Sequence, residues 1–329
     1  MLIIKQRKLA SMLILCGATL SLPATAAASA YPDKPISIVV AYPPGSDTDV
    51  MARLYAEKLA PKVGQSIMVV NRPGASGILG SSSVARAAPD GYTLLFAPST
   101  FATAPLVMKQ QGSTHYHPIN DFQPVIQMTS SSLLVVANPD TKFSHLGDLI
   151  RAAKQGEKLS YGSPGAGSPM HIVGEWLSLT AGVKLQHIPY KGVAPTVTDV
   201  VAGHIPAALV TVGPVQQYLT AGRLKALAVT DPARTPILPD VPTIAESGYP
   251  DVQLRAWNAF FAPAGTPDAV VNLLNENLRQ VLTAPDVIEK LTAMSALPAG
   301  GPPDALAAQL ATDYQQLGAL IKQLNIQAD

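Results

Sequence analysis

Several apolar segments of the chain run into short loops rich in glycine, serine and threonine. The first loop covers Tyr42 to Asp49, the second Asn71 to Gly77, and the third Gly162 to Pro169. Glycine lets the backbone approach a ligand closely, and serine or threonine adds a hydroxyl donor. Where such a loop leads into a helix, unpaired backbone N–H groups and the helix dipole attract an anion. These loops therefore favour binding of a carboxylate by neutral donors.

Signals for catalysis are few. The chain has no G-x-S-x-G elbow and no phosphate-binding loop, and the run from Gly165 to Gly167 lacks the third glycine of a dinucleotide fingerprint. His171 and Glu175 have the i, i+4 spacing at which a helix could share a metal, but the sequence nearby offers no third ligand. We expect no catalytic residue, no metal and no cofactor. A serine hydrolase that uses Ser163 or Ser168 with His171 stays open as the alternative, because a triad assembles in space.

Some of the same residues fit a purely structural role. Ser46 with Asp49, and Thr196 with Asp199, match the S/T-x-x-D pattern of a helix N-terminus, and we interpret both aspartates as capping residues. Ser168 fits either an N-cap or an anion donor, because both roles occupy the same position. Both readings of Ser168 stay open.

The elements that carry the loops follow the alternation of an α/β fold. The first set consists of strands at 36–41, 67–70 and 92–97, with helices at about 51–63 and 78–87. The second set consists of strands at 159–161, 185–188, 207–210 and 226–229, with helices that end near residues 180 and 201. Two strand-like runs, 124–128 and 133–137, lie between the sets. Ligands of open α/β sheets bind at the carboxyl ends of the strands, where these loops lie.

The last part of the sequence contains one strand and then only helices. After a proline-rich connector at 235–250, we expect a strand at 254–262 and helices at 267–282, 287–294 and 304–324. Helices without a new sheet must pack on an existing one, so this part is predicted to return to the first lobe. The chain then crosses between lobes near 129–132 and again near 253–258. Trp257, in the returning strand, is interpreted as core or hinge packing.

The length of the chain after the first thirty residues suits about two domains of roughly 150 residues each. We predict an α/β protein of two lobes, each a doubly wound sheet with flanking helices. The predicted division is a signal peptide at 1–30, the first lobe at 31–131, the second lobe at 132–253 and the rest of the first lobe at 254–329.

The first thirty residues have the pattern of an export signal. Lys5, Arg7 and Lys8 give a basic start, Leu9 to Leu22 is largely apolar, and Ala28-Ser29-Ala30 supplies a cleavage site of small residues. We expect cleavage after Ala30 and a location in the periplasm.

Composition excludes several classes of protein. The only cysteine, Cys16, lies in the predicted signal, so the rest of the chain has no disulfide, thiol nucleophile or cysteine metal site. The 23 Lys and Arg residues nearly balance 22 Asp and Glu residues, which argues against nucleic acid as a partner. With 14% charged and 47% hydrophobic residues, the chain suits a compact protein.

Taken together, these motifs resemble the receptors of tripartite tricarboxylate transporters, also called the Bug family of periplasmic binding proteins. The resemblance covers essentially the whole chain after residue 30. It is carried by the segments 31–35, 42–45, 48–49, 71–75, 89–94, 161–171, 189–192, 238–243 with Glu246, and 262–267.

The resemblance implies a type II periplasmic binding-protein fold that closes like a flytrap around a carboxylate. The ligand-binding residues that it implies are Tyr42, Pro44, Gly45, Ser46, Thr48, Ala75, Ser76, Ser99, Thr100, Ser163, Gly167, Ser168, His171, Tyr190 and Thr211. In one departure, Ser46 stands where the family usually has a second glycine, so the pocket is expected to be narrower or more polar there.

The resemblance also implies the partners. The ligand is expected to be a mono- or dicarboxylate, aliphatic or aromatic, and the receptor to be a monomer that delivers it to the membrane permease of a tripartite tricarboxylate transporter. A receptor that feeds a sensor kinase would have the same sequence features. The expected site is poor in Arg and Lys, so neutral donors and the shape of the cavity are expected to determine selectivity.

Overall fold

The computed structural model describes residues 31–108 and 115–326. The predicted signal peptide lies outside the described residues. The strands are β1 (Ile36–Val40), β2 (Ile67–Asn71), β3 (Thr93–Pro98), β4 (Phe122–Ala137), β5 (Ser160–Ser163), β6 (Gln186–Pro189), β7 (Ala207–Thr211), β8 (Lys225–Val229), β9 (Arg255–Pro263) and β10 (Leu297–Pro298).

The helices alternate with the strands, as the sequence predicts for an α/β fold. They are α1 (Asp47–Val63), α2 (Ile78–Ala85), α3 (Thr100–Val107), α4 (Leu146–Lys154), α5 (Pro169–Ala181), α6 (Val193–Val201), α7 (Gln216–Thr220), α8 (Asp268–Leu282), α9 (Pro285–Ala293) and α10 (Pro303–Gln323), with short 3-10 turns η1 (Ala75–Gly77) and η2 (Gly213–Val215). No described helix combines the length and the apolar character that crossing a membrane requires.

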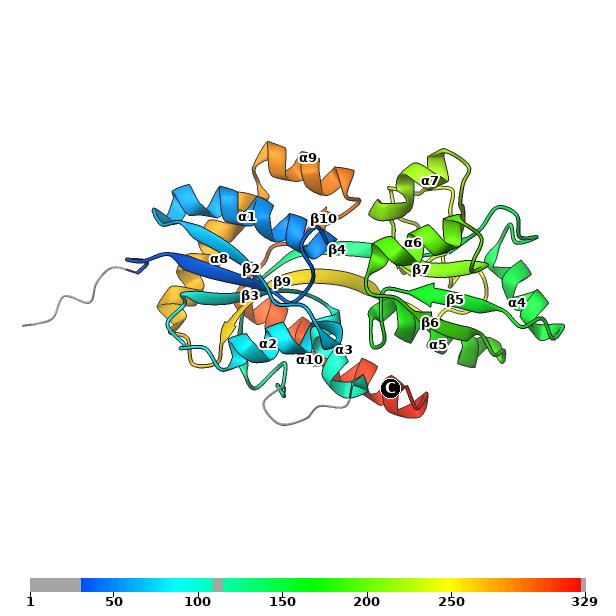
Figure 1. Ribbon diagram of the computed structural model, residues 1–329, viewed down its shortest axis with the longest axis horizontal. Helices are drawn as coiled ribbons and strands as arrows, with labels where there is room; N and C mark the ends of the chain where they lie inside the picture. The colour runs from blue at the N-terminus through cyan, green and yellow to red at the C-terminus, as the bar shows by residue number, and fades with distance from the viewer. Residues whose placement is uncertain (1–30, 109–114, 327–329) are drawn as a thin grey trace, which may run out of the picture. The chain divides into compact units, whose positions relative to one another are not determined.

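The strands form one continuous path in the order β2-β1-β3-β9-β4-β7-β5-β6, with β8 and β10 also paired to β4. Strands β1, β2 and β3 are mutually parallel, as are β5, β6 and β7, whereas β9 and β4 run antiparallel to their neighbours. We call the elements around β1 to β3 the first half and those around β5 to β7 the second half. Figure 1 shows β4 and β9 lying side by side and linking the two halves.

Helices cover both faces of each half, because alternate residues of each strand point to opposite faces. In the first half, Ile38 and Phe96 pack with α1, α8 and α9, whereas Val39 and Leu95 pack with α2, α3 and α10. The second half repeats this arrangement, with α4 and α5 on one face and α6 and η2 on the other. The prediction of a doubly wound α/β fold is confirmed.

Strand β4 differs from the prediction. The two runs predicted at 124–128 and 133–137 belong to a single strand of 16 residues. The polar residues Thr129 to Ser132 between them continue the strand because they pair with Asn258 to Arg255 of β9. Residues Leu133 to Ala137 then pair with β7 and β8. The exact lobe boundaries stay a prediction.

The helices at 268–282, 285–293 and 303–323 pack on the first half, as the sequence predicts. Near its end, α10 also meets the second half, because Leu317 and Ile321 pack against Ile172 of α5. Helices α3, α4 and α7 and the short β10 were not foreseen. Of these, α3 matters most for the site because it begins directly after Ser99.

Candidate ligand-binding site

A cavity of about 320 Å³ lies between the loops that precede the helices. Its walls include the first loop before α1, Ser99 and Thr100 at the start of α3, Ser168 at the start of α5, and Thr211 at the end of β7. Strand β9 adds Trp257 to the wall. The carboxyl ends of strands from both halves therefore face one shared cavity.

The first loop is held by its own side chains. Ser46 is the N-cap of α1, and its Oγ accepts a hydrogen bond of 3.3 Å from the Asp49 N–H. The Asp49 carboxylate accepts from the Gly45 N–H at 2.8 Å and from Asn71 Nδ2 at 2.8 Å. Burial alone would raise the pKa of Asp49, but bonds from Arg53, Gly45 and Asn71 hold this pKa below its ordinary value. The structural interpretation of this pair is confirmed.

The N-terminus of α5 is built in the same way. Ser168 is its N-cap, and the Ser168 Oγ accepts from the His171 N–H at 3.2 Å. Ser168 also lines the cavity. Capping is thus confirmed, while contact with a ligand stays a prediction.

The capping prediction for Thr196 and Asp199 is wrong. Helix α6 begins after Gly192, so Thr196 lies inside the helix and donates to the Gly192 carbonyl at 2.9 Å. The Asp199 carboxylate instead accepts from the Tyr190 hydroxyl at 2.7 Å. The helix starts four residues earlier than the pattern implies, so Thr196 lies about one turn and Asp199 about two turns inside it.

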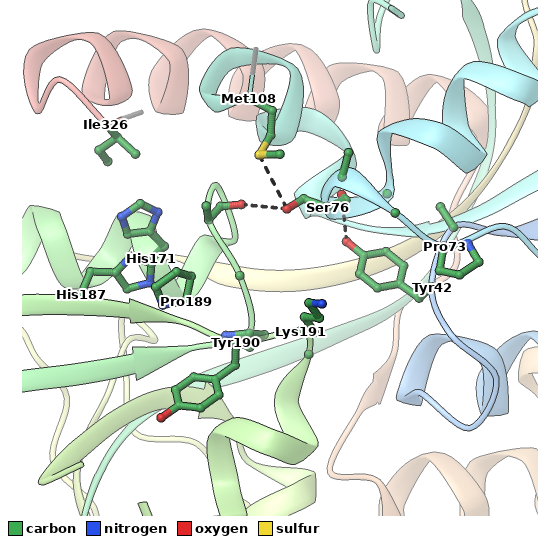
Figure 2. A pocket seen from close by; sticks show the side chains of 18 of the residues that line it. Tyr42, Pro73, Ser76, Met108, His171, His187, Pro189, Tyr190, Lys191 and Ile326 are labelled. Carbon is green, nitrogen blue, oxygen red and sulfur yellow. Dashed lines mark hydrogen bonds between the residues drawn. The ribbon is translucent and has the colours of Figure 1, made fainter. Parts of the chain in front are cut away.

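The second loop makes contact with the third across the cavity. Ala75 and Ser76 have positive φ angles of 48° and 52°, a conformation that residues other than glycine rarely adopt. In this conformation the Ser76 Oγ donates to the Ala166 carbonyl at 3.2 Å, as Figure 2 shows. Nearby, the buried Thr103 Oγ1 donates to the Gly167 carbonyl at 2.6 Å. Two hydroxyl groups of the first half thus bind the third loop of the second half.

A larger cavity of about 920 Å³ adjoins the first one. Tyr42, Ser76 and Lys191 line both cavities. Figure 2 shows its other walls, among them His171, His187 and Ile326. The two cavities together form the candidate site.

Two neutral histidines lie beneath the third loop. The rings of His171 and His187 are stacked with centroids 3.7 Å apart and an interplanar angle of 10°. Burial lowers the pKa of His171 to about 4. Burial, with the adjacent His171 ring, lowers the pKa of His187 to about 3. Each ring is anchored, since His171 Nδ1 accepts from the Gly167 N–H at 3.1 Å and His187 Nε2 lies 2.7 Å from the Ser163 Oγ.

These contacts do not form the hydrolase pair considered above. Ser163 is fully buried and meets His187, not His171. Ser168 meets the backbone of His171, not its ring. His171 Nε2 and Glu175 Oε1 are 4.0 Å apart, and the described residues contain no group of three side chains placed to hold a metal ion.

The structure brings most of the predicted site residues to the two cavities. The smaller one is lined by Tyr42, Pro44, Gly45, Ser46, Thr48, Ser76, Ser99, Thr100, Ser168 and Thr211, and the larger one by Tyr42, Ala75, Ser76, His171 and Tyr190. Ser163 and Gly167 line neither cavity. Ser163 is buried beneath the third loop. A Cβ atom on Gly167 would lie 3.2 Å from the Cβ atom of Val107, so any larger residue would require Val107 to move.

Sequence reasoning missed several lining residues, among them Asp47, Ser131, Asn258 and Lys191. Asp47 lies in the first loop and Lys191 directly after β6, so their positions alone could have nominated them. Trp257 is packed as expected, because it is buried and its Nε1 donates to the Asp313 carboxylate at 2.7 Å. It lines the cavity as well.

Two doubly wound halves, linked by crossing strands with a cavity between them, are the architecture of periplasmic solute-binding proteins. Residues 51–326 match the family described as tripartite tricarboxylate transporter family receptor, and the chain belongs to this family of periplasmic binding proteins. It is a family of binding proteins, so the hydrolase alternative is wrong.

Known relatives are similar in sequence and structure over nearly the whole chain. Protein BugT of Bordetella pertussis is 35% identical over 310 residues, which are 93% of this chain and 94% of BugT. The structure of Rpa4515 from R. palustris with adipate has a TM-score of 0.82 at 32% identity, over 90% of this chain and 98% of Rpa4515. The structure of MatC from Rhodopseudomonas palustris with bound malate has a TM-score of 0.80 at 29% identity, over 88% of this chain and 100% of MatC.

Proposed function

We propose that the protein binds a small mono- or dicarboxylate in the cavity between its two halves and delivers it to the membrane permease of a tripartite tricarboxylate transporter. The observation that carries this proposal is the convergence of the starts of α1, α3 and α5 on one cavity. Each helix start directs backbone N–H groups and the positive end of its dipole toward the same space, which favours an anion.

The scarcity of positive charges on the cavity wall supports binding of the ligand by uncharged donors. Among the described residues that line the smaller cavity, Lys191 is the one cation, and no arginine takes part. The dipole of one helix contributes only about 0.3–1 kcal/mol at an exposed site, whereas micromolar binding requires about 8 kcal/mol. Several helix starts and hydroxyl groups must therefore act together, in a cavity from which closure excludes water.

The two ligand-bound relatives described above each hold a dicarboxylate, adipate in Rpa4515 and malate in MatC. These ligands support the carboxylate class for this chain. Closure of the two halves is the proposed mechanism of capture, and the hydrogen bonds of Ser76 and Thr103 to the third loop support it. The predicted signal peptide, cleaved after Ala30, accounts for export to the periplasm in this proposal.

Ligand-induced stabilisation tests the proposal. A ligand that binds only the folded state raises its stability by about 2.7 kcal/mol at a concentration 100 times its Kd. We expect a saturable rise in melting temperature with at least one member of a panel of aliphatic and aromatic mono- and dicarboxylates. Native mass spectrometry of gently purified protein should reveal a retained ligand by its mass. The absence of both signals, at millimolar concentrations over the whole panel, would overturn the proposal.

A conservative variant locates the binding. Thr100→Val keeps the shape of a side chain on the cavity wall and removes its hydroxyl. We expect about fivefold weaker binding, the effect of one hydrogen bond of about 1 kcal/mol. Thr292→Val, on the exposed side of α9, is the matched control and should bind as the unchanged protein does.

A further inference from the structure

One acidic residue, Asp47, lines a cavity that is otherwise suited to an anion. Asp47 is the first residue of α1, lies between Ser46 and Thr48, and lines the smaller cavity with them. Its side chain is exposed, and within the described part of the chain it makes no hydrogen bond and no ion pair. A ligand carboxylate that approaches the start of α1 therefore meets the unpaired negative charge of Asp47.

The neighbouring acid, Asp49, differs from Asp47 in having several structural partners. Asp49 is buried and is held by Arg53, Asn71 and the Gly45 N–H. Solvent reaches Asp47, yet the protein around it removes enough of its hydration to raise its pKa above the ordinary value. A raised pKa means that the surroundings disfavour the charged form, and a nearby positive charge would relieve this cost.

The described residues on the wall of the smaller cavity contain one positive charge, at Lys191. Lys191 follows β6 in the second half, and in Figure 2 it lies in the space between Tyr42 and Tyr190. In the described part of the chain its amino group makes no ion pair. The cavity thus presents one unpaired negative charge from the first half and one unpaired positive charge from the second.

We infer that the ligand bears an ammonium group beside its carboxylate, and that Asp47 selects for the ammonium group. This inference rests on the proposed function and narrows its ligand from any small carboxylate to a zwitterionic one. The ammonium group pairs with Asp47, and the carboxylate takes the neutral donors and Lys191. A dicarboxylate without an ammonium group leaves Asp47 unpaired and repels it, which lowers its affinity.

Matched ligand pairs test this selection at neutral pH by isothermal titration calorimetry. Aspartate is compared with succinate, glutamate with glutarate, and 2-aminoadipate with adipate, so that each pair differs by the ammonium group alone. We expect at least one ammonium-bearing member to bind at least fivefold more tightly than its partner. In Asp47→Asn this ratio should fall to about one, whereas Asp251→Asn, an exposed acid outside the cavity, should keep it.

The outcomes separate this inference from the proposed function. Equal or tighter binding of the plain dicarboxylates, or a ratio that Asp47→Asn leaves unchanged, overturns the selection by Asp47 while a carboxylate receptor stands. Failure of every acid, in both series and in the monocarboxylate panel, overturns the receptor proposal and this inference with it. A negative residue in the first turn also stabilises a helix. If Asp47 has that role alone, Asp47→Asn lowers the melting temperature and leaves unchanged the ratio of affinities for the ammonium-bearing and plain acids. This result also overturns the inference.

Discussion

The Ser76 hydroxyl donates a hydrogen bond of 3.2 Å to the carbonyl oxygen of Ala166, 90 residues further along the chain. This bond joins the second loop of the first half to the third loop of the second half, at the wall that both cavities share. The Thr103 hydroxyl makes a similar bond to Gly167 at 2.6 Å. Contact between the halves therefore includes two hydroxyl groups beside the candidate site, and the proposed closure predicts that loss of such a contact weakens the closed form.

Removal of this contact should accelerate ligand release. For Ser76→Ala we expect a loss of about 1 kcal/mol from the closed form, and therefore a dissociation rate about fivefold higher. Stopped-flow measurement with a bound ligand checks the rate. Ser83→Ala is the control, because the Ser83 hydroxyl binds the Gly80 carbonyl within the first half. Equal dissociation rates in the two variants would contradict the predicted role of this contact.

The second prediction separates the two roles of Ser46, which caps α1 and lines the cavity. Ser46→Gly removes the hydroxyl, yet glycine is itself a good N-cap and costs only a few tenths of a kcal/mol in stability. Ser46→Ala should cost about 1 kcal/mol of stability. We expect both variants to weaken binding about equally, so affinity follows the hydroxyl and stability follows the cap. Calorimetry and chemical unfolding measure the two quantities, and full affinity in Ser46→Gly would assign the hydroxyl to capping alone.

The pattern of apolar runs and glycine-rich loops was sufficient to predict the alternation of strands and helices. It failed where tertiary pairing overrides local composition. The polar segment from Thr129 to Ser132 has no strand pattern of its own, and it is extended because β9 pairs with it. Helix α3 escaped prediction because Pro105 interrupts its short apolar sequence.

For the site, loops could be predicted more reliably than the direction of individual side chains. Ser163 belongs to a loop of the right kind, but its side chain turns inward to His187, 24 residues away in the sequence. No local pattern reports such a pairing. The position of Asp47 in the first loop could have nominated it, but its residue type does not distinguish a ligand contact from the acid that is common in the first turn of a helix.

The third prediction concerns acid stability. The pKa values of His171 and His187 in the folded protein, about 4 and about 3, lie below the ordinary value of about 6.5. As the pH falls below about 6.5, the unfolded chain takes up protons that the folded protein refuses, so stability decreases. The loss approaches about 1.4 kcal/mol per pH unit for each histidine and ends near pH 4 for His171 and pH 3 for His187.

Substitution of one ring isolates its share of this effect. His187→Gln removes one titrating group, so its stability should decline less steeply between pH 6 and pH 4 by up to about 1.4 kcal/mol per unit. At pH 8 the variant should be less stable, because the ring stack and the Ser163 contact are lost. Urea unfolding at several pH values measures the slope. His115→Gln, at an exposed position, serves as the control, and a slope in His187→Gln as steep as in the control would contradict the prediction.

The last prediction concerns a close contact between the halves away from the cavity. A Cβ atom on Gly213 would overlap the carbonyl oxygen of Met294, and Ser295 beside it donates to the Gln216 side chain at 2.6 Å. Gly213→Ala should therefore force the loop after β7 away from the loop before β10, at a cost of about 1–3 kcal/mol. Gly147→Ala, where a Cβ meets nothing within 4 Å, should instead be neutral or stabilising because it replaces glycine in a helix. If the melting temperature and ligand affinity of Gly213→Ala match those of Gly147→Ala, the two loops do not need this contact, and closure is governed by the loops at the cavity alone.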